Sequence, residues 1–188
     1  MSPCYLRFTH TTFDEIIHTA LGFECEKWHF PIPFKHHRLS YNIGSTLLKF
    51  VPKSEELKLR PDRVSFFITQ PGTYYRAHKD GSDIRFGINY PILIQDSECI
   101  TSWYDDSVLG QGMIDTIGGT SREIVGFRKD NHIPLQSFCM GMGDAVLFNT
   151  DIFHDWDNRL SNNRRVILTF RSSDTNLNYN VAKEILLS

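Results

Sequence analysis

The stretch "RVSFFITQPGTYYRAHKDGSDIRFGINYPILI", residues 63–94, contains three runs rich in β-branched and aromatic residues. Turn signals separate the runs: Pro71-Gly72 between the first two, and Asp80-Gly81 before the third. Proline presets the backbone angle φ and glycine tolerates unusual values of it, so such pairs favour turns. Short apolar runs bounded in this way are typical of β-strands. This stretch therefore predicts a mainly β fold.

The same pattern continues on both sides of this stretch. Further strands are predicted over residues 40–51, 98–104, 144–148 and 164–171. One short helix is predicted near the N-terminus, beginning at Thr11 or Thr12, extending through Leu21 and ending at Gly22. Many short strands after one helix favour an antiparallel double-sheet fold, either a jelly roll or another sandwich.

One segment, from Asp105 to Arg122, is Gly-rich and weakly patterned. It is predicted to form a long loop, and two interpretations stay open. Long loops in compact domains often act as lids or binding loops, and they are as often disordered.

Length and charge limit the classes of function. The 188 residues are expected to form a single domain, with a helix and flanking strands over 1–60, a jelly-roll core over 61–172 and a tail over 173–188. The formal charge of −2 and a pI near 6.4 argue against a nucleic-acid partner, because no global basic field is present. Nothing in the sequence indicates an oligomeric state.

Membrane and disulfide signals are lacking in the sequence. No apolar run approaches the roughly 18–20 residues that cross a bilayer, and the first residues lack the pattern of a secretory signal. The four cysteines lie far apart without a Cys-x-x-Cys motif, which favours free thiols. We therefore expect a cytoplasmic protein without a membrane partner.

His78-Lys79-Asp80 is a candidate half of a metal site. In an extended strand, residues two apart point to the same side, so His78 and Asp80 can both face one ion. With 8 His and 22 acidic residues in the chain, about one such triplet is expected by chance. The triplet therefore needs support from other parts of the sequence.

The third candidate ligand is His154, in "GDAVLFNTDIFHDWDN", residues 143–158. Two His nitrogens and one carboxylate oxygen form the facial triad of non-haem Fe(II) oxygenases, which leaves positions for a co-substrate and O₂. The alternative is that His154 caps a turn among the neighbouring aspartates. A second histidine pair, His36-His37, lies between Lys35 and Arg38, where a solvated basic face is the better interpretation.

Arginines open and close "RRVILTFR", residues 164–171. An unpaired arginine buried in an apolar strand is costly, so we expect it to meet an anion. A dicarboxylate co-substrate would provide one, because a guanidinium binds a carboxylate through two parallel hydrogen bonds. Alternation places Arg165 and Arg171 on one face. Arg165 is favoured over Arg164, which would be solvated where the strand begins.

Arg85, Gly87 and Asn89 share one face of another predicted strand. Gly87 would leave room for a ligand to approach closely. Asn89 could then donate to a carboxylate or to a bound substrate. A cross-strand hydrogen bond is the alternative for Asn89.

Taken together, these motifs resemble the Fe(II)- and 2-oxoglutarate-dependent oxygenases, in particular the aspartyl/asparaginyl β-hydroxylase-like group. The resemblance covers about residues 64–171. In order, it rests on "QPGTYYRAH" (70–78), "RFGINYPI" (85–92), Trp103, "GDAVLFNTDIFHDWDN" (143–158) and "RRVILTFR" (164–171).

The resemblance implies a double-stranded β-helix of the jelly-roll or cupin type. It implies that His78, Asp80 and His154 bind Fe(II), that Arg165 holds the distal carboxylate of 2-oxoglutarate, and that Asn89 assists. Animal members of the group have glycine where this chain has Asp80 and bind iron with two histidines. This departure makes the chain look more like a conventional triad enzyme, and it puts transfer of the animal substrate in doubt.

The implied reaction uses O₂ and 2-oxoglutarate to hydroxylate an unactivated C–H bond, with release of succinate and CO₂. The expected substrate is an amino acid, a peptide or a similar small carboxylate-bearing molecule. Arg85 and Arg171 would lie near the barrel mouth and could meet that substrate, with surface salt bridges as the alternative. Tyr74, Arg76 and Trp103 are weaker pocket candidates, and Trp103 is favoured as a core residue.

Three rival functions stay open. Arg165 and Arg171 form an Arg-x₅-Arg pair like that of oxygenases that demethylate nucleic-acid bases, although the acidic balance argues against such a substrate. A jelly-roll binding domain with structural histidines is the second. A metal-dependent cupin that does not use 2-oxoglutarate is the third.

Overall fold

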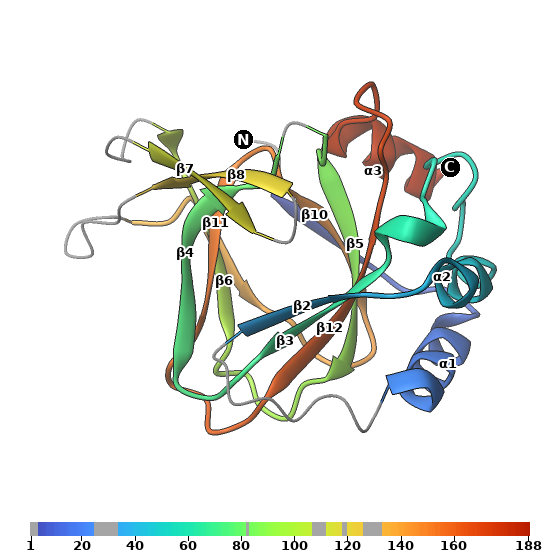
Figure 1. Cartoon of the computed structure of the whole chain (residues 1–188), viewed down its shortest axis with the longest axis horizontal. Helices are drawn as coiled ribbons and strands as arrows, with labels where there is room; N and C mark the ends of the chain where they lie inside the picture. The colour runs from blue at the N-terminus through green and yellow to red at the C-terminus, as the bar shows by residue number, and fades with distance from the viewer. Residues whose placement is uncertain (1–3, 25–33, 82, 107–111, 118–119, 126–132) are drawn as a thin grey trace.

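The computed structural model describes residues 4–24, 34–81, 83–106, 112–117, 120–125 and 133–188 (Figure 1). The described strands form two six-stranded antiparallel sheets. In spatial order, the first sheet contains β1 (Tyr5–Phe8), β10 (Ala145–Asn149), β5 (Phe86–Leu93), β12 (Arg165–Arg171), β3 (Ser65–Thr69) and β2 (Phe34–Arg38). The second contains β7 (Gly112–Ile117), β8 (Thr120–Val125), β4 (Thr73–Lys79), β11 (Phe153–Asn158), β6 (Ile100–Tyr104) and β9 (Gln136–Cys139). The chain is a double-stranded β-helix, as predicted.

Three α-helices lie in the described residues: α1 (Phe13–Glu24), α2 (Tyr41–Leu48) and α3 (Tyr179–Leu187). α1 and α2 lie beside the first sheet, on the side away from the second (Figure 1). The largest apolar core joins all three helices to this sheet. Its fully buried members include Ile16, Ala20, Leu47, Phe66, Ile88, Leu168, Phe170 and Ala182. Because this core lies outside the barrel, it leaves the space between the sheets for other groups.

The space between the two sheets is only partly apolar. A smaller cluster occupies part of it, formed by Cys4, Trp103, Phe138, Met140, Val146, Phe148 and Ile167. The indole N–H of Trp103 donates to the backbone oxygen of Asn149 at 3.0 Å, so this buried ring is satisfied, and Trp103 is a core residue. The rest of the interior holds polar side chains and a cavity.

A β-bulge interrupts the pairing of β4 with β11. His154 pairs with His78 but Trp156 pairs with Tyr75, so β4 has one more residue than β11 between these two pairs. A bulge changes which side chains share a face of the strand. The ring of Tyr75 consequently meets His78 edge-on, with 4.7 Å between the ring centroids.

The prediction of a strand over residues 40–51 is wrong, because Tyr41–Leu48 forms α2. The side chain of Ser40 caps this helix by accepting from the backbone N–H of Ile43. Gly44 packs against the backbone of Pro61, and a Cβ at that position would lie 2.1 Å from the Pro61 oxygen. This close contact between helix and turn is a tertiary feature that the local apolar pattern does not reveal.

Two other boundaries differ from the predictions. α1 does not end at Gly22 but continues to Glu24. The segment predicted as a long loop contains β7 and β8, which pair as antiparallel strands. The Gly118-Gly119 turn signal between them lies outside the described residues.

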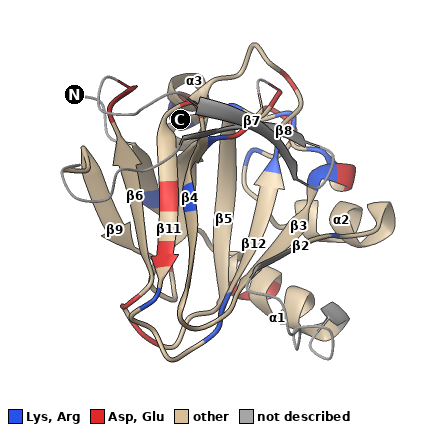
Figure 2. Cartoon of the chain, turned by 60° about the vertical axis from the view of Figure 1, so that its left-hand side comes forward, with Lys and Arg blue, Asp and Glu red and all other residues tan. Residues whose placement is uncertain are grey.

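Charged residues are interspersed along the described ribbon, and no strip of one sign stands out in this view (Figure 2). No helix within the described ranges is both long enough and apolar enough to cross a bilayer. Cys4, Cys99 and Cys139 are free thiols, and Cys25 lies outside the described residues.

Candidate metal centre

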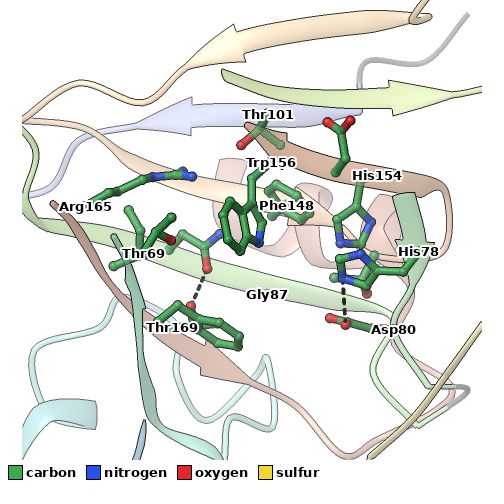
Figure 3. Close-up of a pocket in the computed structure, with 15 residues that line it drawn as sticks. Thr69, His78, Asp80, Gly87, Thr101, Phe148, His154, Trp156, Arg165 and Thr169 are labelled. Carbon is green, nitrogen blue, oxygen red and sulfur yellow. Dashed lines mark hydrogen bonds and ion pairs between the residues drawn. The ribbon is translucent and has the colours of Figure 1, made fainter. Parts of the chain in front are cut away.

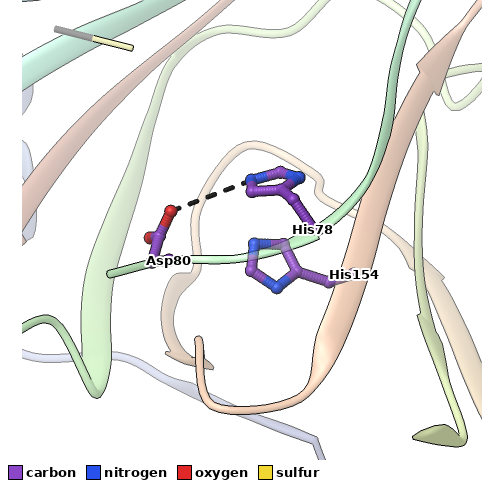
Figure 4. A group of neighbouring side chains, drawn as sticks. All are labelled: His78, Asp80 and His154. Atoms are coloured by element: carbon purple, nitrogen blue, oxygen red, sulfur yellow. Dashed lines mark ion pairs between the residues drawn. The ribbon is translucent and has the colours of Figure 1, made fainter. Parts of the chain in front are cut away.

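His78, Asp80 and His154 converge inside the barrel (Figure 4). His78 is on β4, Asp80 follows the end of that strand, and His154 lies near the start of β11. All three are buried, and one ligand atom from each lies within 4.8 Å of the others. The chain therefore brings together the three residues that were predicted as a triad.

Both imidazoles are oriented by the backbone two residues earlier. Nδ1 of His78 donates to the Arg76 carbonyl oxygen at 2.9 Å, and Nδ1 of His154 donates to the Ile152 carbonyl oxygen at 2.9 Å. A carbonyl oxygen only accepts, so Nδ1 carries the proton in each ring. The other nitrogen, Nε2, is then the one with a lone pair for a metal ion.

The two oxygens of Asp80 have different neighbours. Oδ1 faces Nε2 of His78 at 3.8 Å, and Oδ2 accepts a hydrogen bond from Nη2 of Arg171 at 2.8 Å. The carboxylate is 2% exposed and the Arg171 side chain 11%, so the pair is buried. The guanidinium also lies over the ring of Phe67, 5.1 Å from its centroid. Arg171 thereby fixes the orientation of the carboxylate.

The donor set fits a divalent transition-metal ion. Two imidazole nitrogens and one carboxylate oxygen are the ligands of the facial triad in non-haem Fe(II) sites. The backbone acceptors on the two rings and the guanidinium on the carboxylate are the outer contacts that orient metal ligands.

The triad lines a cavity between the sheets (Figure 3). Its volume of about 80 Å³ is several times the 10–15 Å³ that one water molecule needs, so it has room for a small organic molecule. Fifteen residues line it: Phe67, Thr69, His78, Asp80, Gly87, Asn89, Thr101, Phe148, Thr150, His154, Asp155, Trp156, Arg165, Ile167 and Thr169. Figure 3 shows Arg165 on one side of Trp156 and the two histidines on the other.

Arg165 is a buried cation that forms no ion pair with an acidic side chain of the described residues. Its residue is 8% exposed, and Nη1 donates to Sγ of Cys99 at 3.2 Å. Its Nε has no hydrogen-bond acceptor, and no carboxylate among the described residues forms an ion pair with it. Arg164, by contrast, is half-buried, donates to the side chain of Gln70 at 3.4 Å, and does not line the cavity. A buried guanidinium of this kind favours an anionic ligand.

Gly87 and Asn89 line the cavity from β5. Thr169 donates to Oδ1 of Asn89 at 2.7 Å across the β5–β12 pair. This is the cross-strand hydrogen bond weighed for Asn89. Since the amide oxygen accepts it, the amide NH₂ of Asn89 is left as the donor toward a ligand.

The two predicted substrate residues, Arg85 and Arg171, do not line the cavity. Arg85 pairs with Asp151 at 3.1 Å and donates to the Thr175 carbonyl oxygen at 3.4 Å. Arg171 pairs with Asp80. Both guanidiniums therefore have intramolecular partners, and a role in substrate binding stays a prediction.

Trp156 and Tyr75 lie at the site and were not predicted. Trp156 lines the cavity, and Tyr75 stacks on it with the ring planes 14° apart. Strict alternation from His78 instead favoured Tyr74 and Arg76, which are both exposed. The bulge in β4 accounts for Tyr75, and no local sequence signal marks its position. Trp156, by contrast, lies two residues after His154 on β11, so alternation from His154 could have identified it.

Asp155 also borders the cavity. Burial raises the pKa of Asp155 to about 7, although the hydroxyl of Tyr104 donates to its Oδ2 at 2.8 Å and opposes that shift.

The histidine pair His36-His37 is not part of the candidate metal centre. His36 and His37 are on β2, and the His36 ring stacks on Phe67 at 4.7 Å between centroids.

No protein-family model and no curated protein matches the chain. Among solved structures, the chain is similar to the epimerase SnoN in complex with Fe³⁺, alpha ketoglutarate and nogalamycin RO. The TM-score is 0.56 at 11% identity, over 89% of this chain and 78% of that one. This likeness supports the jelly-roll fold.

Weaker similarities extend to two other kinds of protein. An oxalate decarboxylase from Lactobacillus farciminis has a TM-score of 0.41 at 10% identity, over 77% of this chain and 30% of that one. Vicilin from Corylus avellana (hazelnut) has a TM-score of 0.40 at 10% identity, with the same coverage of 77% and 30%. The chain thus spans less than a third of the length of either protein.

Proposed function

We propose that this chain is an Fe(II)- and 2-oxoglutarate-dependent dioxygenase. It would hydroxylate an unactivated C–H bond of an amino acid, a peptide or a similar small carboxylate-bearing molecule. One observation supports this most strongly: a single cavity is lined both by the buried His78, Asp80 and His154 and by Arg165, a buried cation that no described carboxylate neutralises. A ligand that both chelates a metal and has a distant carboxylate suits such a cavity.

Each residue has a distinct task in this proposal. His78, Asp80 and His154 hold Fe(II) through Nε2, Oδ1 and Nε2. Arg165 pairs with the distal carboxylate of 2-oxoglutarate. The Asn89 amide donates to the co-substrate, and Thr169 keeps that amide in place through the hydrogen bond it donates at 2.7 Å.

Bound Fe(II) would supply the activation of O₂ that no protein side chain provides. The overall reaction converts the substrate C–H bond, O₂ and 2-oxoglutarate into a C–OH group, succinate and CO₂. The protein binds and orients the reactants between the two sheets and limits the access of water. SnoN, which has the same fold, was crystallised with Fe³⁺ and alpha ketoglutarate, so a jelly roll of this kind accommodates both ligands.

Anaerobic titration with Fe(II) and then 2-oxoglutarate tests the proposal. We expect a weak visible charge-transfer band that requires both additions. The band should be absent from His78→Ala and His154→Ala. His37→Ala is the matched histidine control: His37 is half-buried on β2, and this variant should keep the band. If the two triad variants bind iron and form the band like the wild type, the oxygenase proposal fails.

Succinate formation with a panel of amino acids, short peptides and alkylated oligonucleotides then identifies the substrate class. A product heavier by one oxygen atom supports hydroxylation. Arg165→Ala separates this proposal from a cupin that does not use 2-oxoglutarate: a large rise in the apparent KM for 2-oxoglutarate supports our proposal, and unchanged activity contradicts it.

Demethylation of alkylated nucleic-acid bases by the same chemistry is a second candidate. Arg165 and Arg171 of the Arg-x₅-Arg pair are both buried, and one lines the cavity while the other contacts Asp80. The contact with Asp80 gives Arg171 a task that does not depend on the substrate. Release of formaldehyde from the oligonucleotides in the panel would favour this candidate.

A further inference from the structure

Cys99 contacts the buried guanidinium of Arg165. It is 5% exposed, and its Sγ accepts the hydrogen bond from Nη1 of Arg165 at 3.2 Å. Cys99 immediately precedes β6 and does not line the cavity, whereas Arg165 does. The thiol therefore contacts Nη1 of Arg165 from outside the set of residues that line the cavity.

The chemical type of this contact is unusual for a buried arginine. Such a guanidinium is normally paired with a carboxylate, which neutralises it. A thiol is a weak acceptor without charge, and burial raises the pKa of Cys99 more than the adjacent Arg165 lowers it. One N–H of Arg165 is thus satisfied while the positive charge is kept.

We propose that Cys99 is a positioning residue that aims Arg165 into the cavity and leaves its charge available for the distal carboxylate of the co-substrate. This inference rests on the proposed function. It adds a residue and a physical reason for its type: an acidic side chain at position 99 would hold Arg165 equally well but would compete with the ligand for it.

Three substitutions at this position separate orientation from charge. Cys99→Ala removes the acceptor, and we expect the Kd of 2-oxoglutarate to rise by roughly 2- to 10-fold, the range of one modest hydrogen bond. Cys99→Ser keeps an acceptor and should restore most of the affinity. Cys99→Asp should raise the Kd by about 100-fold or more, because the carboxylate neutralises Arg165.

Binding is measured by calorimetry with 2-oxoglutarate and protein loaded with Mn(II), which binds without turnover. Cys139→Ala is the matched control. Cys139 donates to the Ser97 carbonyl oxygen at 2.8 Å, pairs with Ile100 of β6, and forms no hydrogen bond with Arg165 among the described residues. In steady-state assays of succinate formation, Cys99→Ala should raise the KM for 2-oxoglutarate while kcat stays within about twofold. The Kd of Mn(II) should be the same in all variants.

The outcomes distinguish this inference from the proposed function. If the wild type binds no 2-oxoglutarate, both fail. If the wild type binds it and Cys99→Asp binds equally well, the role of Cys99 is overturned and the proposed function stands. Equal losses of Mn(II) and 2-oxoglutarate affinity in Cys99→Ala would indicate general structural damage and would also overturn the inference. A folded Cys99→Asp that keeps Mn(II) but loses 2-oxoglutarate supports it.

Discussion

Nη2 of Arg171 donates a 2.8 Å hydrogen bond to Oδ2 of Asp80, and both side chains are buried. The two residues come from opposite sheets, since Arg171 ends β12 and Asp80 follows β4. This ion pair therefore joins the sheets at the candidate metal centre. Removing one partner of a buried pair is costly, because it leaves the other charge unpaired.

We expect Arg171→Met to lower both stability and metal affinity. Methionine keeps apolar contact with Phe67 but leaves the Asp80 carboxylate buried without its cation, at a cost of about 3–5 kcal/mol in the free energy of unfolding. Urea denaturation and calorimetric titration with Mn(II) measure the two effects. The double variant Asp80→Ala/Arg171→Met should regain most of the stability but no metal affinity. A single variant that matches the wild type in both assays would contradict the importance of this pair.

Gly87→Ala should weaken ligand binding without weakening the fold. The added methyl group would lie 3.4 Å from Cγ2 of Thr169, an ordinary contact, and would occupy part of the cavity. We expect the free energy of unfolding to change by less than about 1 kcal/mol, while the Kd of 2-oxoglutarate rises severalfold. Gly141→Ala, at an exposed site with nothing within 4 Å, should change neither quantity. Unaltered affinity in Gly87→Ala would mean that the ligand does not approach β5.

Two helical glycines should respond in opposite directions to alanine. A Cβ at Gly44 would collide with the Pro61 oxygen at 2.1 Å, so Gly44→Ala should lower the free energy of unfolding by about 2 kcal/mol or more. A Cβ at Gly22 in α1 would have no neighbouring atom within 4 Å. Gly22→Ala should therefore raise the free energy of unfolding by about 0.5–1 kcal/mol through helix propensity. Thermal and urea unfolding test both changes, and an equal response would be evidence against the packing of α2 on the Pro61 turn.

Stability should fall in mild acid because of His10. Its Nε2 lies 2.8 Å from the hydroxyl of Tyr90, and burial lowers the pKa of His10 below its ordinary value, although Glu15 opposes the shift. Between the folded pKa and about 6.5 the unfolded chain binds more protons, so the free energy of unfolding decreases as pH falls through this window. Urea denaturation of the wild type and of His10→Gln at pH 7.5 and 5.0 measures this contribution to the free energy of unfolding. The excess stability of the wild type over His10→Gln should be smaller at pH 5.0 than at pH 7.5. A difference in stability that does not change with pH would refute the role of His10.

Local patterns were sufficient to predict most strands of the barrel. The runs around Pro71-Gly72 and Asp80-Gly81 formed β3, β4 and β5, because alternation and turn chemistry act over a few residues. Alternation also placed Arg165 and Arg171 of β12 on one face, and Arg165 lines the cavity. The pairing of His78 with His154 across β4 and β11 is a long-range contact, so residue types offered His154 only as a candidate ligand, which the resemblance then supported.

Features that depend on distant contacts could not be predicted in this way. The bulge that turns Tyr75 toward His78 arises from pairing with β11, so alternation selected Tyr74 and Arg76 instead. α2 was mistaken for a strand because its close approach to Pro61 at Gly44 is invisible in the local pattern. The side of β12 on which Arg171 lies was predictable, but its ion pair with Asp80 was not.

β12 supplies both Arg165 and Arg171 from one face, six positions apart. Loss or gain of a single residue between them would turn one guanidinium to the opposite face of the sheet. Relatives that keep this chemistry should therefore accept exchanges of side chain within the strand while rejecting insertions and deletions there. A gap of one residue in an alignment between these two arginines would then mark relatives that lack the proposed activity.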